Sequence, residues 1–172
     1  GQGIPAAINV LMEEMACSAN VSFATYVGLT RGAYRAVNTF ANDDLKNQFL
    51  PKMVSGEWSG TMCLTEPQCG TDLGLIKTKA TLQSDGTYTL SGTKIFITAG
   101  EHDLTQNIIH LVLGRLPDAP KGIKGISLFL VPKFLPDTEG NPSTRNPIFC
   151  ARIENKMGIK ASPTCVMNFD EA

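Results

Sequence analysis

Two patterns of apolar and polar residues divide the chain near residue 55. Before this point, apolar side chains recur at helical spacing in two stretches, which are Ile8, Leu11, Met12, Met15 and Ala16, and then Phe23, Val27, Tyr34, Val37 and Phe40. Asn42 is a favourable N-cap for a third helix from Asp43 to about Met53, with acidic residues in its first turn. Residues 5–53 are therefore predicted to be helical.

Short β-branched and apolar runs replace this pattern from Gly60 onward. The predicted strands are 77–83, 88–91, 94–98, 108–113, 125–131, 148–153 and 164–169. Ser84–Thr87 has the composition of a hairpin turn, and the polar segment 135–146 is predicted to be a loop. The pattern predicts an α+β fold, with helices in residues 1–55 and a small antiparallel β-barrel or sandwich in residues 56–172.

Composition and charge exclude several classes of protein. Lys and Arg total 15 against 16 Asp and Glu, giving a net charge of -1, so charge gives no support to a nucleic-acid partner. No apolar run approaches the ~18 residues of a membrane helix. Residues 1–5 show neither an initiator Met nor a signal-peptide pattern, so we expect the natural N-terminus upstream and a cytoplasmic location.

The cysteines and histidines do not form a metal-binding pattern. The five Cys contain no C-x-x-C pair, and their odd number without an export signal indicates reduced thiols. His102 and His110 are not spaced with any Cys as zinc ligands usually are, so no metal site is expected.

The stretch 61–72 contains the strongest candidate for chemistry. A strand, Thr61–Thr65, leads into a tight turn that contains Pro67 and Gly70. Gly70 permits close backbone approach, and the following amides with Thr71 could form an anion-binding nest. A plain β-turn capped by Asp72 explains the same residues.

The same stretch resembles the signature loop of the acyl-CoA dehydrogenases, x-C-[LIV]-T-E-P-x-x-G-[ST]-D. It matches at Cys63, Leu64, Thr65, Glu66, Pro67, Gly70, Thr71 and Asp72. It departs at Met62, where an aromatic residue is common, and at Cys69, where a smaller residue is usual. Residues 91–100 resemble the family's strand beside the flavin, with Phe96 in place of Trp and Ala99 in place of Asn. Blocks 121–132 and 156–165 follow in the family's order.

This resemblance implies a domain organisation. Residues 1–55 would be the end of the N-terminal helical domain and residues 56–172 the middle β-domain, with the C-terminal helical bundle absent. Within the family, residues 62–80 and 100–103 most resemble the 3-methylmercaptopropionyl-CoA dehydrogenases. The implied partners are an acyl-CoA substrate and an electron-transferring flavoprotein, in a homodimer or homotetramer.

The resemblance also implies a set of FAD-binding residues. Backbone groups of Met62, Leu64 and Thr65 would meet the pyrimidine edge of the flavin, with a hydrogen bond from the Thr65 hydroxyl. Gly70 and Thr71 would approach the pyrophosphate, and Thr71 would also touch the substrate. Phe96, with its neighbour Ile97, would pack against the ring system, and Thr98 would donate toward flavin N5. For Phe96, core packing is the alternative.

The other polar residues near these motifs are expected to have structural rather than catalytic roles. Glu66 and Asp72 are expected to fix the loop by hydrogen bonds rather than act as bases. Lys94 and Arg115 are expected to be solvated or ion-paired surface groups. His102 is expected to be an exposed histidine near the site.

The family's reaction is α,β-dehydrogenation of an acyl thioester, with the β-hydride passing to flavin N5. The catalytic base is a Glu of the C-terminal helical domain, so no catalytic residue is assigned within these 172 residues and the chain alone is predicted to be inactive. Two alternatives remain: a non-dehydrogenase flavoprotein of the same fold, of the DNA-alkylation-response type, and a β-domain that serves only as an interaction module.

Overall fold

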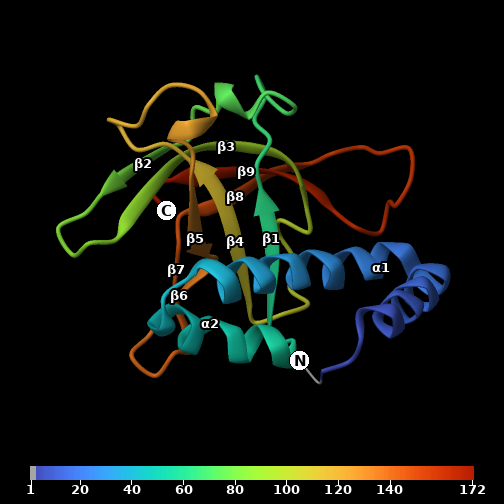
Figure 1. Cartoon of the computed structure of the whole chain (residues 1–172). Coiled ribbons are helices and arrows are strands. Elements are labelled where there is room, and N and C mark those ends of the chain that lie inside the picture. Colours follow the sequence, from blue (N-terminus) through green and yellow to red (C-terminus); the bar gives the residue numbers. More distant parts are fainter. Residues whose placement is uncertain (1–2) are drawn as a thin grey trace.

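Two helices cover one face of a pair of stacked β-sheets (Figure 1). The computed structural model describes residues 3–172. The elements are α1 Ala6–Phe40, α2 Asp43–Ser55, β1 Trp58–Cys63, η1 Leu73–Leu75, β2 Lys79–Leu82, β3 Tyr88–Thr98, β4 Asn107–Gly114, η2 Ile123–Gly125, β5 Ser127–Pro132, β6 Phe134–Pro136, β7 Pro142–Arg145, β8 Ile148–Ile153 and β9 Thr164–Asp170.

The predicted helices form, and asparagine side chains mark two of their starts. Asn20 has non-helical backbone angles and divides α1 at a kink, where its Oδ1 accepts a hydrogen bond from the Phe23 amide at 3.0 Å. Asn20 therefore caps the second half of α1. Asn42 caps α2 as predicted, accepting from the Leu45 amide at 2.9 Å. Gly56 ends α2 in the left-handed conformation.

The strands confirm the α+β class and, of the two predicted arrangements, form stacked sheets; one strand pairing differs from the prediction. They form one sheet of order β1-β4-β5, one of order β2-β3-β9-β8 and a separate β6-β7 hairpin, rather than a closed barrel. β1 and β4 pair in parallel, although all-antiparallel pairing was predicted. The connection between them crosses through β2 and β3 of the other sheet, and such a crossover permits parallel pairing. The predicted loop 135–146 contains most of the β6-β7 hairpin.

β4 separates the two hydrophobic cores, because its side chains alternate between the faces of its sheet. Val112 faces the second sheet and packs with Leu90, Met167 and Phe169. Ile109 and Leu111 face the helices and belong to the core that Trp58 and Phe49 share. The helices and the first sheet therefore form one packed unit, with the second sheet behind it.

Gly60 allows α1 to approach β1 closely. A Cβ atom at this position would lie 2.5 Å from the Ala33 Cβ. The Gly60 amide also donates to the Thr30 hydroxyl at 3.1 Å. The helix is thereby fixed over the strand that leads into the signature loop.

All five cysteines are free thiols in the structure. Burial raises the pKa of Cys63 to about 12, so this thiol stays protonated at neutral pH. Among the helices of residues 3–172, none combines the length and apolar content needed to cross a bilayer.

Candidate functional site

The two main sequence motifs meet where β1 ends and β3 bulges. Three hydrogen bonds join them: Ile95 N to Thr65 O at 2.9 Å, Lys94 Nζ to Leu64 O at 3.1 Å, and Lys94 Nζ to Glu66 Oε1 at 2.8 Å. Segments 30 residues apart in sequence therefore form one structural unit. This unit contains most of the residues for which the family resemblance implies FAD contacts.

Glu66 fixes the signature loop, as its structural interpretation predicted. Its buried carboxylate accepts hydrogen bonds from the amides of Lys77 and Thr78 at 2.7 and 3.0 Å, and from the Thr78 hydroxyl. Burial raises the pKa of this carboxyl, but the hydrogen bonds from Lys94, Thr78 and Lys77 outweigh burial and lower the pKa from 4.5 to about 2. A carboxylate so fully engaged is a structural anchor and not a free base.

This lowered pKa makes the stability of the fold sensitive to acid. The Glu66 carboxylate stabilises the fold above its unfolded-state pKa, and this contribution is lost as the pH falls from about 4.5 to about 2. The expected loss is on the order of 3 kcal/mol in the free energy of unfolding. Urea unfolding at pH 7, 4 and 3 follows the loss, of which about 2 kcal/mol is expected by pH 3. Glu66→Gln is the control, since its midpoint should fall less over the same range; equal falls in both proteins would contradict the prediction.

The structure corrects the expectation for Lys94 and Arg115. Lys94 is completely buried and pairs with Glu66; it precedes the bulge, in register with Met167, and lies on the same face of β3 as the buried Leu90. Arg115 is only partly exposed, and its guanidinium donates to four backbone carbonyls. Asp72 behaves as expected: its carboxylate caps the short helix η1 by accepting from the Gly74 amide at 3.0 Å.

The bulge in β3 turns Phe96 outward. The pairing of β3 with β9 shifts between Lys94 and Ile97, and Phe96 takes a φ of 59° within the shift. The residue is 60% exposed, which excludes core packing as the role of this side chain. A bulky residue at positive φ is strained, and such strain is concentrated at functional sites. Ala99 also has positive φ, at the position where the resembled motif has Asn.

Several polar groups on the two joined motifs remain free for a ligand. Within residues 3–172, the hydroxyls of Thr65, Thr71 and Thr98 make no hydrogen bond, and the amides of Gly70 and Thr71 find no acceptor. Gly70 and Thr71 are exposed, and Thr65 and Thr98 are half-buried. These groups fit a cofactor that offers a flat ring and an anionic chain.

The other residues of the predicted set have limited access to a ligand. Ile97 lies in the core between the sheets, so only its backbone is available. Met62 packs toward the helices. The carbonyls of Leu64 and Thr65 are already used by Lys94 and Ile95. A ligand bound at the two motifs would therefore contact groups of Leu64 and Thr65 other than these carbonyls.

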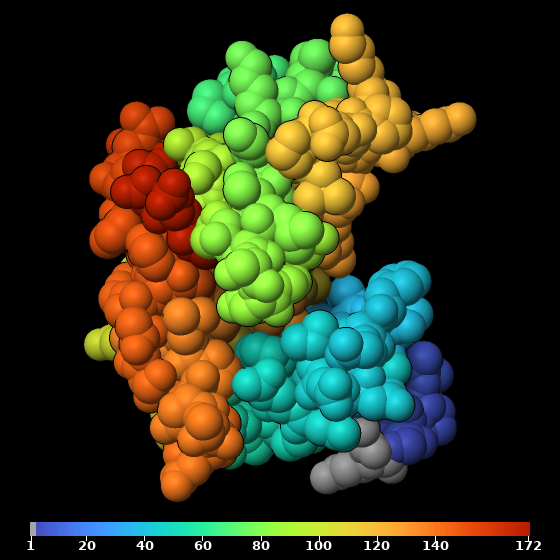
Figure 2. Space-filling model, turned by 90° about the vertical axis from the view of Figure 1, so that its left-hand side faces the viewer, coloured from blue at the N-terminus to red at the C-terminus, as the bar shows by residue number. Residues whose placement is uncertain are grey.

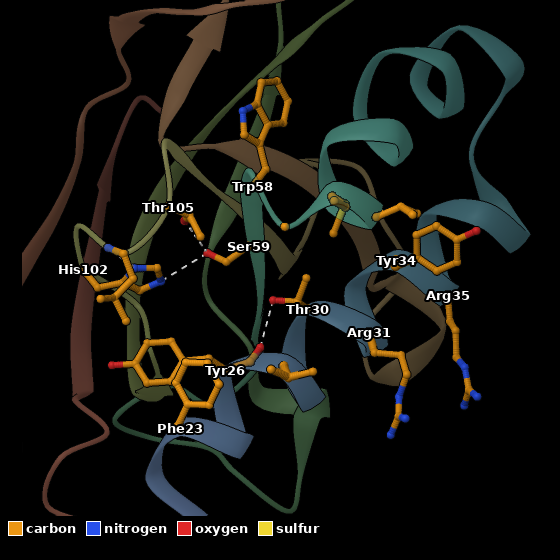
Figure 3. A pocket seen from close by; sticks show the side chains of 15 residues that line it. Phe23, Tyr26, Thr30, Arg31, Tyr34, Arg35, Trp58, Ser59, His102 and Thr105 are labelled. Atoms are coloured by element: carbon orange, nitrogen blue, oxygen red, sulfur yellow. Dashed lines mark hydrogen bonds between the residues drawn. The ribbon is translucent and has the colours of Figure 1, made fainter. Parts of the chain in front are cut away.

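A separate apolar pocket of about 600 Å³ lies between the helices and the start of β1 (Figure 3). No sequence pattern predicts this pocket, because its residues are scattered along the chain. They are Phe23, Tyr26, Val27, Thr30, Arg31, Tyr34, Arg35, Met53, Val54, Gly56, Trp58, Ser59, His102, Leu104 and Thr105. None of them belongs to the predicted flavin set, so this pocket and the motif unit are distinct features.

His102 lies in the wall of this pocket and is half-buried rather than exposed. Its Nε2 is 3.1 Å from the Ser59 hydroxyl, which is 3.0 Å from the Thr105 hydroxyl, and its ring meets the edge of Tyr26 (Figure 3). Burial and the nearby Lys133 lower the pKa of His102. These contacts make His102 part of the packing of its loop.

Comparison with known proteins matches residues 61–172 to the middle domain of acyl-CoA dehydrogenases. The whole chain is 50% identical to a 3-methylmercaptopropionyl-CoA dehydrogenase of Ruegeria pomeroyi, and 92% of the chain is 45% identical to a butyryl-CoA dehydrogenase of Syntrophomonas wolfei. The acyl-CoA dehydrogenase complexed with FAD from Bacillus anthracis aligns with the entire chain at a TM-score of 0.77 and 27% identity.

The chain is shorter than each of these relatives. It spans 29% of the Ruegeria pomeroyi protein and 26% of the Syntrophomonas wolfei protein. It also spans 26% of the Bacillus anthracis chain. The relatives therefore contain large regions that have no counterpart in residues 1–172.

Proposed function

This chain belongs to the acyl-CoA dehydrogenase family, and from that membership we propose that it supplies the flavin-facing part of an FAD-dependent enzyme that dehydrogenates acyl-CoA thioesters. The match of residues 61–172 to the family's middle domain supports the assignment. The substrate we propose is 3-methylmercaptopropionyl-CoA or a short- to medium-chain acyl-CoA, on the basis of the relatives' names.

The observation that carries the proposal is the junction of the two motifs. Lys94 and Ile95 hydrogen-bond to Leu64, Thr65 and Glu66. Among the described residues, the junction leaves threonine hydroxyls without a hydrogen bond and an outward aromatic ring on one structural unit. A binding site is expected to hold such polar groups on a rigid support, with their hydrogen-bonding capacity left for the ligand.

Each group has a proposed task. Phe96 offers a flat apolar face to the flavin ring, and the hydroxyls of Thr65 and Thr98 orient the ring edge by hydrogen bonds. The amides of Gly70 and Thr71, with the Thr71 hydroxyl, hold the pyrophosphate and border the acyl-CoA. Bound FAD supplies the acceptor for the hydride that leaves the substrate β-carbon.

The remaining expectations from the sequence stay predictions. We propose residues 1–55 as the end of a helical domain; exposed apolar side chains on α1, such as Leu11, Met15 and Phe23, support this division. The base that removes the α-proton is placed outside this chain. An electron-transferring flavoprotein as acceptor, assembly as a homodimer or homotetramer and a cytoplasmic location are proposed from the family resemblance alone.

Anaerobic titration with acyl-CoA tests this function. The chain is carried in a protein of the relatives' length, loaded with FAD and titrated with 3-methylmercaptopropionyl-CoA and with butyryl-CoA. Bleaching of the visible flavin band is expected with at least one of them, because hydride transfer reduces the flavin. The stronger response identifies the substrate class.

The 172-residue chain is the matched control. It is expected to turn over neither thioester in the presence of an electron acceptor, because the proposed base lies outside it. Turnover by the 172-residue chain would contradict the placement of the base. A protein of the relatives' length that binds no flavin would refute the cofactor, and bound flavin that neither thioester reduces would favour the non-dehydrogenase alternative.

A further inference from the structure

The Arg115 guanidinium joins two loops beside the signature motif. Its Nε donates to Ile76 O at 3.0 Å, and its Nη2 donates to Gly74 O at 2.8 Å. On the other side, Nη2 donates to Gly122 O at 2.6 Å and Nη1 to Pro120 O at 3.1 Å. Four of the five N–H donors of this side chain are therefore used on main-chain carbonyls.

The first of these loops continues directly from the proposed cofactor contacts. Gly74 and Ile76 lie two to five residues after Thr71 and Asp72 in the chain. The regular structure of this loop is limited to the three-residue helix η1. Position and orientation of the exposed Gly70–Thr71 segment therefore depend on what holds residues 74–76.

The second loop, residues 116–125, projects from the body of the protein. In the space-filling view, the yellow-orange segment near residue 120 stands above the cyan part of α1, and the surface is hollowed between them (Figure 2). The packing inside this loop is tight: a Cβ at Gly125 would lie 1.8 Å from Pro120 O and 2.8 Å from Arg115 Nη1. Gly125 therefore permits the approach of Pro120 to the guanidinium.

The chemistry of arginine suits this bridging role. Among the ion pairs of residues 3–172, none includes Arg115, so carbonyl dipoles rather than a carboxylate balance its charge. A planar guanidinium can serve carbonyls on two sides at fixed angles, whereas a lysine ammonium cannot span them. The contact is therefore specific in geometry and not only in charge.

We propose that Arg115 is a positioning residue of the FAD site, which holds the segment 70–76 in its ligand-binding conformation by clamping it to the loop 116–125. This inference rests on the proposed FAD site. It assigns Arg115 no contact with FAD or substrate. Without this contact, the segment 70–76 should be less ordered in the FAD-free protein. Part of the binding free energy would then be used to order it, so FAD should bind more weakly.

Two readouts test the proposal in the FAD-binding protein of the relatives' length. Arg115→Met and Arg115→Lys are both expected to raise the Kd for FAD about tenfold. Both are also expected to speed amide hydrogen exchange of residues 70–76 and 116–125 in the FAD-free protein, with the rest of the chain unchanged. Lys121→Met is the matched control, because this exposed lysine in the same loop makes no hydrogen bond among the described residues; it should change neither readout.

Gly125→Ala breaks the same clamp without removing the charge. Its added methyl group displaces Pro120 from the guanidinium, so it should reproduce both effects. It also provides the test if the Arg115 variants do not fold. Unchanged exchange in residues 70–76, exchange that rises equally throughout the chain, or full rescue by lysine would each overturn the inference. A wild-type protein without FAD affinity would refute the proposed function. Amide hydrogen exchange would then still test whether Arg115 holds the two loops together.

Discussion

Replacement of Lys94 by methionine is expected to lower the free energy of unfolding by about 3–5 kcal/mol. The Lys94 side chain is completely buried and Glu66 is 3% exposed, with 2.8 Å between their charged atoms. Methionine fills a similar volume but leaves the Glu66 carboxylate buried without its counter-charge, and Leu64 O without its donor. Denaturant unfolding followed by circular dichroism measures the loss.

Lys79→Met provides the control for this prediction. Lys79 is exposed on β2, so the same substitution should change the free energy of unfolding by no more than about 0.5 kcal/mol. A second substitution, Glu66→Gln in the Lys94→Met background, should recover part of the loss because it removes the stranded charge. A loss below about 1 kcal/mol for Lys94→Met would show that the buried pair contributes little to stability.

Local chemistry in the sequence was sufficient to predict most elements. The helical spacing before residue 55 and the Asn42 cap correspond to α1 and α2, and the strand runs correspond to β3, β4, β5, β8 and β9. The turn at Ser84–Thr87 joins β2 to β3 as expected. These features depend on side chains close in sequence, whose periodicity and capping can be recognised without tertiary contacts.

Features that depend on distant contacts were missed or wrong. A lysine in a strand is expected to be solvated, and only the buried counter-charge of Glu66, 28 residues away, explains the burial of Lys94. The role of Arg115 depends on four carbonyls in two loops, which no local pattern encodes. Parallel pairing of β1 with β4 likewise follows from a crossover through the second sheet.

The candidate site also has one residue whose role could be predicted from local sequence and one whose orientation could not. Glu66 could be predicted as a loop anchor because Pro67 and the tight turn favour a fixed carboxylate over a mobile base, and the structure confirms this. The outward position of Phe96 could not be derived from strand alternation, since the bulge interrupts the alternation at that residue. Only the family resemblance placed its ring beside a flavin.

Replacement of Phe96 by asparagine is expected to weaken FAD binding without lowering the stability of the fold. Asparagine adopts positive φ more readily than a bulky residue, and the exposed ring contributes little packing. The free energy of unfolding of the FAD-free protein should therefore stay constant or rise by up to about 1 kcal/mol. The Kd for FAD should rise at least tenfold, or about 1.4 kcal/mol, because the apolar face for the ring is lost.

Phe149→Asn is the matched control for this substitution. Phe149 is 51% exposed on β8 and is not among the residues with positive φ, so asparagine there should leave FAD affinity unchanged and relieve no strain. Fluorescence titration with FAD and denaturant unfolding of the FAD-free proteins give both quantities. Wild-type FAD affinity in Phe96→Asn would remove Phe96 from the cofactor site. A loss of 2 kcal/mol or more in unfolding free energy would instead assign its ring to packing, since strain relief cannot lower stability.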